Sequence, residues 1–185
     1  MRRSRLIAAA AVIGVAGFTA AATAGDHKRG FETDMLGYEE VPSVSTIGGG
    51  QVDAEINRDG TSIHYRLQYR NLEGNVLQSH IHLGQKDANG AIVVFLCTNL
   101  GNGPAGRATP ACPPAPATVE GDLTKEDVST APAPANAINQ GIAAQEFDEL
   151  VRAMRAGVTY ANVHSSKFPG GEIRGQFDLQ GHQDD

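Results

Sequence analysis

Apolar residues recur at every second position over much of this chain, in short runs that glycine-containing turns separate. The clearest case covers residues 51–56 and 62–69, where apolar and polar side chains alternate along both runs. Between them, Asn57-Arg58-Asp59-Gly60 supplies a turn that ends in Asp-Gly. Because successive side chains of a strand point to opposite faces, this pattern predicts a β-hairpin with one buried face.

Other segments extend the β pattern, and one segment has a helical period. The run 91–97 is apolar throughout and rich in β-branched residues, which predicts a central strand buried on both faces. Thr124 is predicted to cap a helical turn, and residues 144–156 form the one predicted helix of any length. The 22 glycines suit many short strands better than a helical bundle. Further strands are predicted at residues 31–36, 78–84, 118–122, 158–164 and 172–179.

The first 24 residues are predicted to be a cleaved signal peptide. A basic start is followed by an apolar run at 6–18 and by Ala22-Thr23-Ala24, which fits the small-x-small cleavage pattern. We therefore expect a periplasmic or secreted protein, exported by the general route or, given Arg2-Arg3, by the twin-arginine route. Residues 25–30 and 181–185 are expected to be flexible ends around one domain at 31–180. No later run is apolar enough to predict a membrane span.

Charge and cysteine usage narrow the chemistry further. The formal charge of −6 argues against nucleic acid and anionic membranes as partners, and the sequence leaves any protein partner open. The chain has two cysteines, Cys97 and Cys112, on either side of a loop rich in glycine, proline and alanine. In an oxidising compartment a disulfide that pins this loop is favoured, and thiolate ligation of a metal is the alternative.

Two distant segments carry histidines at strand spacing. His80 and His82 share one face of the segment 78–84, while Ile81 and Leu83 point to the other. In the segment 159–164, Tyr160, Asn162 and His164 share a face opposite Ala161 and Val163. If the two strands lie side by side, three imidazoles meet on the outer face of the sheet. Such a set suits copper, favoured by its affinity order, or zinc.

The alternative is that these histidines only form hydrogen bonds across strands, without a metal. If a metal binds, the second ring nitrogens need acceptors, and Glu172, Asn162 and Gln78 are the candidates on that face. Arg174 could attract an anion, but a simple salt bridge with Glu172 is favoured. His64, on the polar face of the hairpin, is predicted to be a solvated histidine with no ligand role.

Taken in chain order, several short motifs resemble those of one known family, the CHRD domain, a module of the animal protein chordin that also occurs alone in exported bacterial proteins. The resemblance covers about residues 31–180. The motifs are Glu39-Glu40-Val41-Pro42, Asp59-Gly60, Ser79-His80-Ile81-His82-Leu83-Gly84, Cys97-Thr98-Asn99, Asn162-Val163-His164 and Phe168-Pro169-Gly170-Gly171-Glu172-Ile173-Arg174-Gly175-Gln176.

This resemblance implies an all-β fold, an antiparallel Greek-key-like β-sandwich with one added helix and the disulfide-pinned loop. The paired histidines plus one distant histidine are also similar to the copper ligands of copper/zinc superoxide dismutase. Three functions follow as expectations: an exported copper-binding domain, a copper-dependent oxidoreductase of the dismutase type, and a non-catalytic extracellular interaction module. The third expects the three imidazoles to lie well apart.

Overall fold

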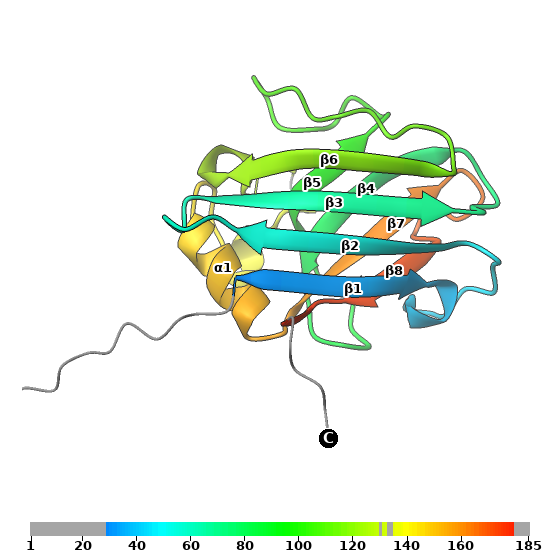
Figure 1. Cartoon of the computed structure of the whole chain (residues 1–185), viewed down its shortest axis with the longest axis horizontal. Helices are drawn as coiled ribbons and strands as arrows, with labels where there is room; N and C mark the ends of the chain where they lie inside the picture. The colour runs from blue at the N-terminus through cyan, green and yellow to red at the C-terminus, as the bar shows by residue number, and fades with distance from the viewer. Residues whose placement is uncertain (1–28, 130, 133–134, 180–185) are drawn as a thin grey trace, which may run out of the picture.

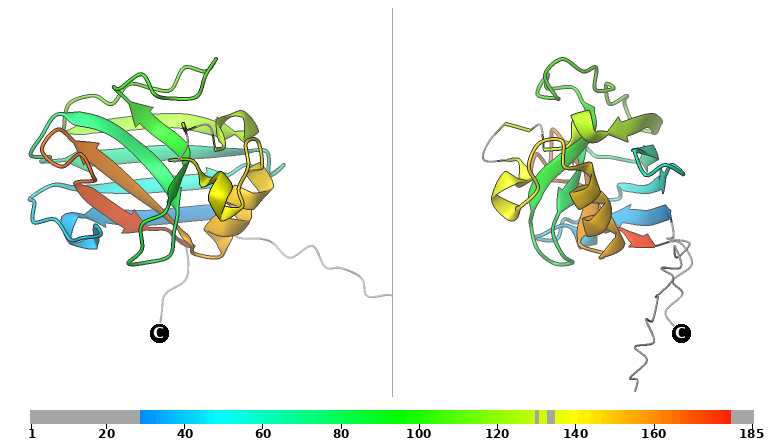
Figure 2. Two further views of the ribbon diagram at one scale, coloured as in Figure 1. Left: turned by 180° about the vertical axis from the view of Figure 1, so that it is seen from behind. Right: turned by 90° about the vertical axis from the view of Figure 1, so that its left-hand side faces the viewer.

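The computed structural model describes residues 29–179 apart from 130, 133 and 134, and it is built from two facing layers of antiparallel strands (Figures 1 and 2). The predicted signal peptide and the tail at 181–185 lie outside the described residues. The front layer of Figure 1 holds β1 (Gly30–Leu36), β2 (Gly49–Ile56), β3 (Ser62–Arg70) and β6 (Ala117–Thr124). The back layer holds β4 (Val76–Leu83), β5 (Ala91–Thr98), β7 (Thr159–Ser165) and β8 (Ile173–Gln176).

One continuous path of pairings connects the two layers. The strand order is β5-β4-β7-β8-β1-β2-β3-β6, and every strand pair along it is antiparallel. The layers join along one edge, where Leu36 of β1 pairs with Arg174 of β8 and where β9 (Asp178–Leu179) pairs with β1. The predicted all-β, two-layer architecture is therefore confirmed, and the layers approach a barrel that is open on the opposite side.

The strand β5 lies at the end of this path, so its prediction as a central strand is wrong. Among the described residues its ladder partner is β4, and its other backbone bridge joins Ile92 to Asn136. Residues 93–97 are nevertheless buried. The apolar run therefore predicted the burial of β5 correctly. A strand can be buried on both faces without having a hydrogen-bonded neighbour strand on both sides.

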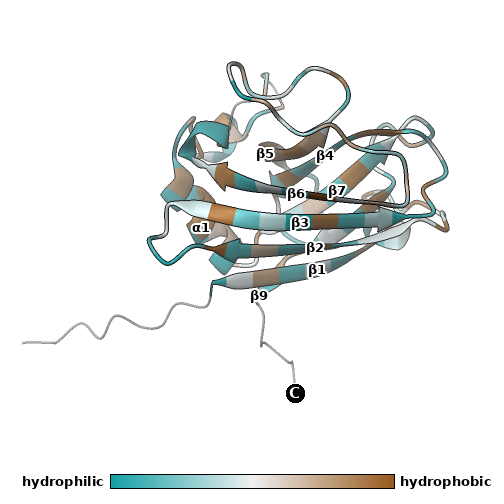
Figure 3. Ribbon diagram, turned by 45° about the horizontal axis from the view of Figure 1, so that its top comes forward, coloured by the Kyte–Doolittle hydropathy of each residue, from teal (hydrophilic) through white to brown (hydrophobic). Residues whose placement is uncertain are grey.

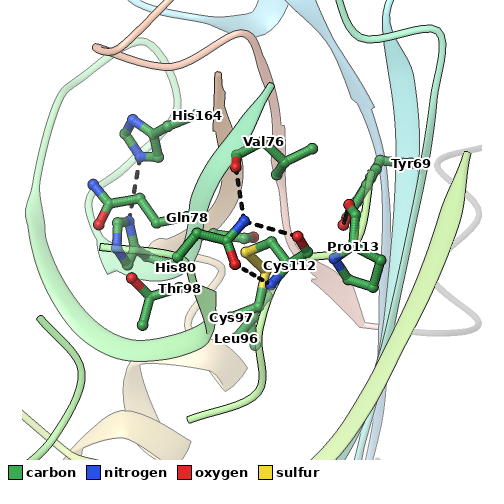
Figure 4. Close-up of a disulfide and its surroundings, with 12 residues drawn as sticks. Tyr69, Val76, Gln78, His80, Leu96, Cys97, Thr98, Cys112, Pro113 and His164 are labelled. Carbon is green, nitrogen blue, oxygen red and sulfur yellow. Dashed lines mark hydrogen bonds between the residues drawn. A yellow bond between two sulfur atoms is a disulfide. The ribbon is translucent and has the colours of Figure 1, made fainter. Parts of the chain in front are cut away.

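The open side between β5 and β6 is closed by side chains and by a disulfide (Figure 4). Tyr65 of β3 donates its hydroxyl to the carbonyl of Leu96, and Tyr69 donates to Pro113. The predicted disulfide joins Cys97 of β5 to Cys112 in the loop before β6. Asn99 supports the same loop, since its amide nitrogen donates to the carbonyls of Val76 and Cys112. The loop 98–116 is thus pinned as predicted.

The core fills the space between the layers. Colouring by hydropathy shows the alternation along the front strands (Figure 3). The predicted inward sets of the hairpin are all buried, with Val52, Ile63 and Leu67 fully inaccessible. Burying a side chain of this size contributes about 1.5–3 kcal/mol. From the back layer Ile81, Ala161 and Val163 enter the same cluster, so the histidines beside them must point to the other face.

Helices occupy little of the described chain. The helix α1 (Phe147–Arg155) closes one end of the layers with Phe147, Leu150, Val151 and Met154 buried. It begins three residues later than predicted, because Gln145 adopts a φ of 71° that no helix continues. Short 3₁₀ turns are η1 (Gly37–Glu39), η2 (Lys125–Asp127) and η3 (Ala137–Gln140), and Thr124 caps η2 with Asp127 as predicted. No helix of the described residues is long and apolar enough to cross a membrane.

Removing the disulfide should destabilise the fold measurably. Replacing Cys97 and Cys112 together by serine frees a loop with a sequence separation of 15 residues, and we expect the free energy of unfolding to fall by about 3 kcal/mol because the unfolded chain gains entropy. Denaturant unfolding of both proteins measures this. A loss below about 1 kcal/mol would show that the tyrosine hydrogen bonds close this side without help.

Candidate metal centre

The antiparallel pairing of β4 with β7 brings the distant histidines together. In the register of this ladder His164 lies opposite Gln78, Asn162 opposite His80, and Tyr160 opposite His82. One ring nitrogen from each of His80, His82 and His164 lies within 4.8 Å of the other two. His80 Nδ1 is 3.2 Å from His164 Nε2, and a dashed line in Figure 4 marks this contact. The predicted convergence of the three imidazoles is therefore confirmed.

These histidines occupy the predicted face, but that face is not open to solvent as expected. His80 is fully buried, and His82 and His164 are each 7% exposed. The loop 84–90 lies against this face, and Asn89 donates its side-chain amide to the carbonyl of Val41 in the segment after η1. Alternation identifies the face away from the core, but it does not say whether loops cover it.

Two loop carbonyls fix the ring orientation. His82 donates Nδ1–H to the carbonyl of Gly90 at 2.9 Å, and His164 donates Nδ1–H to the carbonyl of Pro169 at 3.0 Å. In a neutral imidazole the other nitrogen then carries a lone pair. The Nε2 atoms of His80 and His82 are buried without a hydrogen-bond partner among the described residues. These loop carbonyls could not be identified from the sequence, because a backbone acceptor has no residue signature.

Burial keeps the rings neutral. Desolvation lowers the pKa of His80 well below its ordinary value, and the neighbouring His164 and His82 lower it further. Desolvation lowers the pKa of His82 to about 4, and it also lowers the pKa of His164. Unprotonated nitrogens are the form that binds a metal. At neutral pH the centre therefore offers lone pairs and no positive charge of its own.

Of the predicted acceptors for the second ring nitrogens, Asn162 contacts a histidine. Its Oδ1 lies 3.1 Å from His164 Nε2. The other two carry hydrogen bonds elsewhere: Gln78 Oε1 accepts from Asn102, and Glu172 Oε1 accepts from the Thr46 hydroxyl and the Glu73 amide. Glu172 precedes β8, so strand alternation did not govern its direction.

Arg174 has a different role from the predicted salt bridge with Glu172, which is not among the ion pairs of the described residues. Its guanidinium lies 3.5 Å from the centre of the Tyr160 ring and donates to the carbonyls of Gln85 and Ala88. His82 stacks on Tyr160, with 4.7 Å between ring centres. Both cannot occupy one face, so Tyr160 lies between them. Through its two hydrogen bonds to Gln85 and Ala88, Arg174 holds the loop that covers the centre.

Glu40 is a buried residue of this region that the sequence reasoning missed as a site residue. Desolvation raises the pKa of its carboxyl to about 7, against the opposing effects of Arg174 and of a hydrogen bond from Asn162. The only available signal was its place in the motif Glu39-Glu40-Val41-Pro42. His64, by contrast, is exposed as predicted and binds Asp122 on the front layer.

Comparison with known proteins gives one match. The family model of the CHRD domain matches residues 31–177, which includes all three histidines. No curated protein and no solved structure matches.

Protonation of His82 should make the metal-free protein acid-sensitive. The folded state resists protonation down to about pH 4, whereas the unfolded chain takes up a proton near pH 6.5. The contribution of His82 to the free energy of unfolding is therefore fully present above pH 6.5. It is lost as the pH falls towards 4, and the loss amounts to about 3 kcal/mol. Glu40 acts in the opposite sense, because its raised pKa favours folding as the pH falls below 7.

A comparison with a His82→Gln variant isolates this contribution, since Glu40 is common to both proteins. Denaturant unfolding with chelator present measures the free energy of unfolding from pH 7.5 to 4. We expect the advantage of the unmodified protein over the variant to shrink with acid. The same difference at every pH would contradict the prediction, and His64→Gln serves as the exposed control.

Proposed function

Since the chain belongs to the CHRD domain family, we propose that it is an exported member that binds one metal ion through His80, His82 and His164, with copper favoured and zinc as the alternative. One observation carries this proposal. Several lone pairs converge at a buried point where the described residues supply too few hydrogen atoms to satisfy them.

The hydrogen-bond donors to the ring nitrogens can be counted. The Nδ1–H groups of His82 and His164 are committed to loop carbonyls, so both Nε2 atoms are acceptors. His80 Nδ1 can donate one hydrogen to His164 Nε2. Within the described part of the chain, His82 Nε2 then has no donor and His80 Nε2 has no hydrogen-bond partner. Leaving a buried polar group unsatisfied costs about 1–3 kcal/mol, and a bound cation would remove such a cost.

The donor set fits a metal of this class. Copper and zinc bind imidazole nitrogen at about 2.0–2.1 Å, which places two ligand nitrogens about 3.3 Å apart in a tetrahedral site. His80 Nδ1 and His164 Nε2 are 3.2 Å apart, so a metal bound by both would replace the hydrogen between them. One nitrogen of each ring lies within 4.8 Å of the other two, so a small closure of the rings would complete the set. Nitrogen donors without thiolate suit Cu²⁺ or Zn²⁺. The carbonyls of Gly90 and Pro169 hold the rings as second-layer acceptors commonly do in metal sites.

The competing expectations receive less support. A metal-free interaction module expects the three imidazoles to lie apart, whereas they meet. Dismutase-type catalysis needs access for a small anion, but Arg174 is 2% exposed and it donates hydrogen bonds to three residues of the covering loop. We therefore propose binding or storage of the ion rather than redox turnover. The disulfide supports export to an oxidising compartment.

Metal titration tests the proposal. The purified protein, treated with chelator and then titrated with Cu²⁺ or Zn²⁺ in a calorimeter, should bind one equivalent. His82→Ala should weaken binding by at least about 100-fold, because it removes a ligand rather than a supporting group. His64→Ala should bind as the unmodified protein does. Unchanged binding by His82→Ala would refute the three-histidine site.

Binding should also stabilise the fold. Because only the folded chain brings β4 to β7, free metal at 100 times its dissociation constant should raise the free energy of unfolding by about 2.7 kcal/mol. Thermal unfolding with and without Zn²⁺ measures this, and excess chelator should reverse it. The His82→Ala variant should show little change. An equal rise in that variant would place the bound ion elsewhere on the protein.

A further inference from the structure

We propose that the loop 84–90 is a gate through which the metal ion enters and leaves, and that Asn89 is the latch that keeps this gate closed. The inference rests on the proposed three-histidine site, and it concerns how fast an ion exchanges rather than how tightly it binds. The latch is the hydrogen bond that the Asn89 side-chain amide donates to the carbonyl of Val41, at 2.9 Å.

A path for the ion has to open because the candidate ligands are covered. None of the three histidines is more than 7% exposed. Two loop carbonyls mark the segments that cover them, because Gly90 accepts from His82 and Pro169 accepts from His164. The loop 84–90 therefore covers one side of the centre, and the turn after β7 covers the other. An ion can reach the ligands only when one of these covers moves.

The seam between the two covers is closed by Asn89. In the turn after β7, a Cβ at Gly171 would overlap the Glu40 carboxyl, so Glu40 packs against this turn. Val41 is the next residue of the chain, and its carbonyl accepts from the Asn89 side chain. Asn89 also accepts from Arg174, at 3.5 Å. One exposed side chain thus joins the loop to the opposite cover.

The base of the loop is held by contacts that do not involve this seam. Gly84 donates its amide to the carbonyl of Val158. The Gln140 side chain bridges the two strands that the loop connects, since it donates to the carbonyl of Leu83 and accepts from the amide of Ala91. These contacts keep β4 and β5 together, so the ends of the loop stay fixed when its middle moves.

The middle of the loop, residues 85–89, is held less firmly. Among the described residues its one backbone–backbone hydrogen bond joins the Ala88 amide to the Gln85 carbonyl. Four of these five residues are exposed. Side chains supply the other hydrogen bonds, because Arg174 donates to the carbonyls of Gln85 and Ala88, and Asn89 supplies the latch. A segment with little buried surface opens locally at a low cost in free energy.

The opposite cover is fixed by its own backbone. In the turn 166–171, Gly171 donates its amide to the carbonyl of Phe168, and Ser166 donates to the carbonyl of Asn75. This turn also leads directly into β8. The gate is therefore formed by the loop between β4 and β5 and not by the turn after β7.

A gate of this kind controls rates and leaves the affinity unchanged. An ion enters and leaves only while the gate is open, so both rates are proportional to the population of the open state. The latch is present with and without the ion, so its removal changes both rates by the same factor. Losing one hydrogen bond of ordinary strength raises the open population about fivefold.

Exchange kinetics with Cu²⁺ as the probe test the inference. Asn89→Ala removes the latch, and Lys86→Ala, at another exposed position of the same loop, is the matched control. Entry is followed by rapid mixing of the metal-free protein with Cu²⁺, release by mixing the loaded protein with excess chelator, and affinity by competition at equilibrium. Thermal unfolding confirms that both variants fold.

A second measurement needs no metal. Diethyl pyrocarbonate acylates accessible imidazoles, and mass spectrometry of peptides locates the modified residue. In the metal-free protein the rate at His82 reports how often the gate opens, and the exposed His64 is the internal reference.

We expect Asn89→Ala to speed entry and release of Cu²⁺ about fivefold each, with unchanged affinity, and to speed acylation of His82 by the same factor. Acylation of His64 should not change, and Lys86→Ala should behave as the unmodified protein. Unmodified rates in Asn89→Ala would overturn the inference. Faster release with a matching loss of affinity would also overturn it, because Asn89 would then stabilise the bound state alone.

Two other results would separate the gate from the site. Equal acceleration in Lys86→Ala would overturn the assignment of Asn89 as the latch, although the three-histidine site would stand. An unmodified protein that binds no Cu²⁺ would refute the proposed function, and an ion gate with it, before any variant is compared.

Discussion

The register of β4 against β7 is the constraint on which the candidate site depends. Ile81, Ala161 and Val163 are all fully buried in the interlayer core, and they fix which side of each strand faces inward. A slip of one residue would turn His164 into that core and Val163 out of it, which would bury a polar ring and remove an aliphatic side chain from the core. The hydrophobic alternation therefore sets the position of the imidazoles, although none of them packs in the interlayer cluster.

A second set of interactions connects the loop that covers the site with the candidate ligand His82. The loop 84–90 is fastened by Arg174, whose guanidinium lies on Tyr160, and the same ring stacks on His82. Gly90, at the end of this loop, accepts from His82 and donates its amide to the Tyr160 hydroxyl. The contacts that hold the loop therefore also orient the imidazole of His82. Water is excluded by the same contacts, which is why the histidines lose their affinity for protons.

Sequence reasoning reached those features that depend on alternation or on a specific residue type. The hairpin, the face of His80 and His82, the partner strand with His164 and the disulfide from Cys97 all follow from periodicity or chemistry. Prediction from the sequence failed for features that depend on contacts between segments far apart in the chain. The end position of β5, the cover over the histidines and the directions of Glu172 and Arg174 depend on loops that no local pattern describes. Glu40 was visible as a motif residue, but its packing against the distant Gly171 could not be predicted from the motif.

The charges around the three histidines are compatible with the proposed cation. Arg174 is buried and offsets Glu40 only in part, since desolvation still raises the pKa of Glu40 to about 7. The neutral imidazoles cannot help, because burial opposes their protonation. Near neutral pH the Glu40 carboxyl is therefore partly charged, and the neutral imidazoles carry no positive charge that could offset it. A divalent ion held by the three histidines, as proposed, would stabilise that carboxylate and satisfy the nitrogen lone pairs together. The proposed ion would thus complement this arrangement of residues both in charge and in hydrogen bonding.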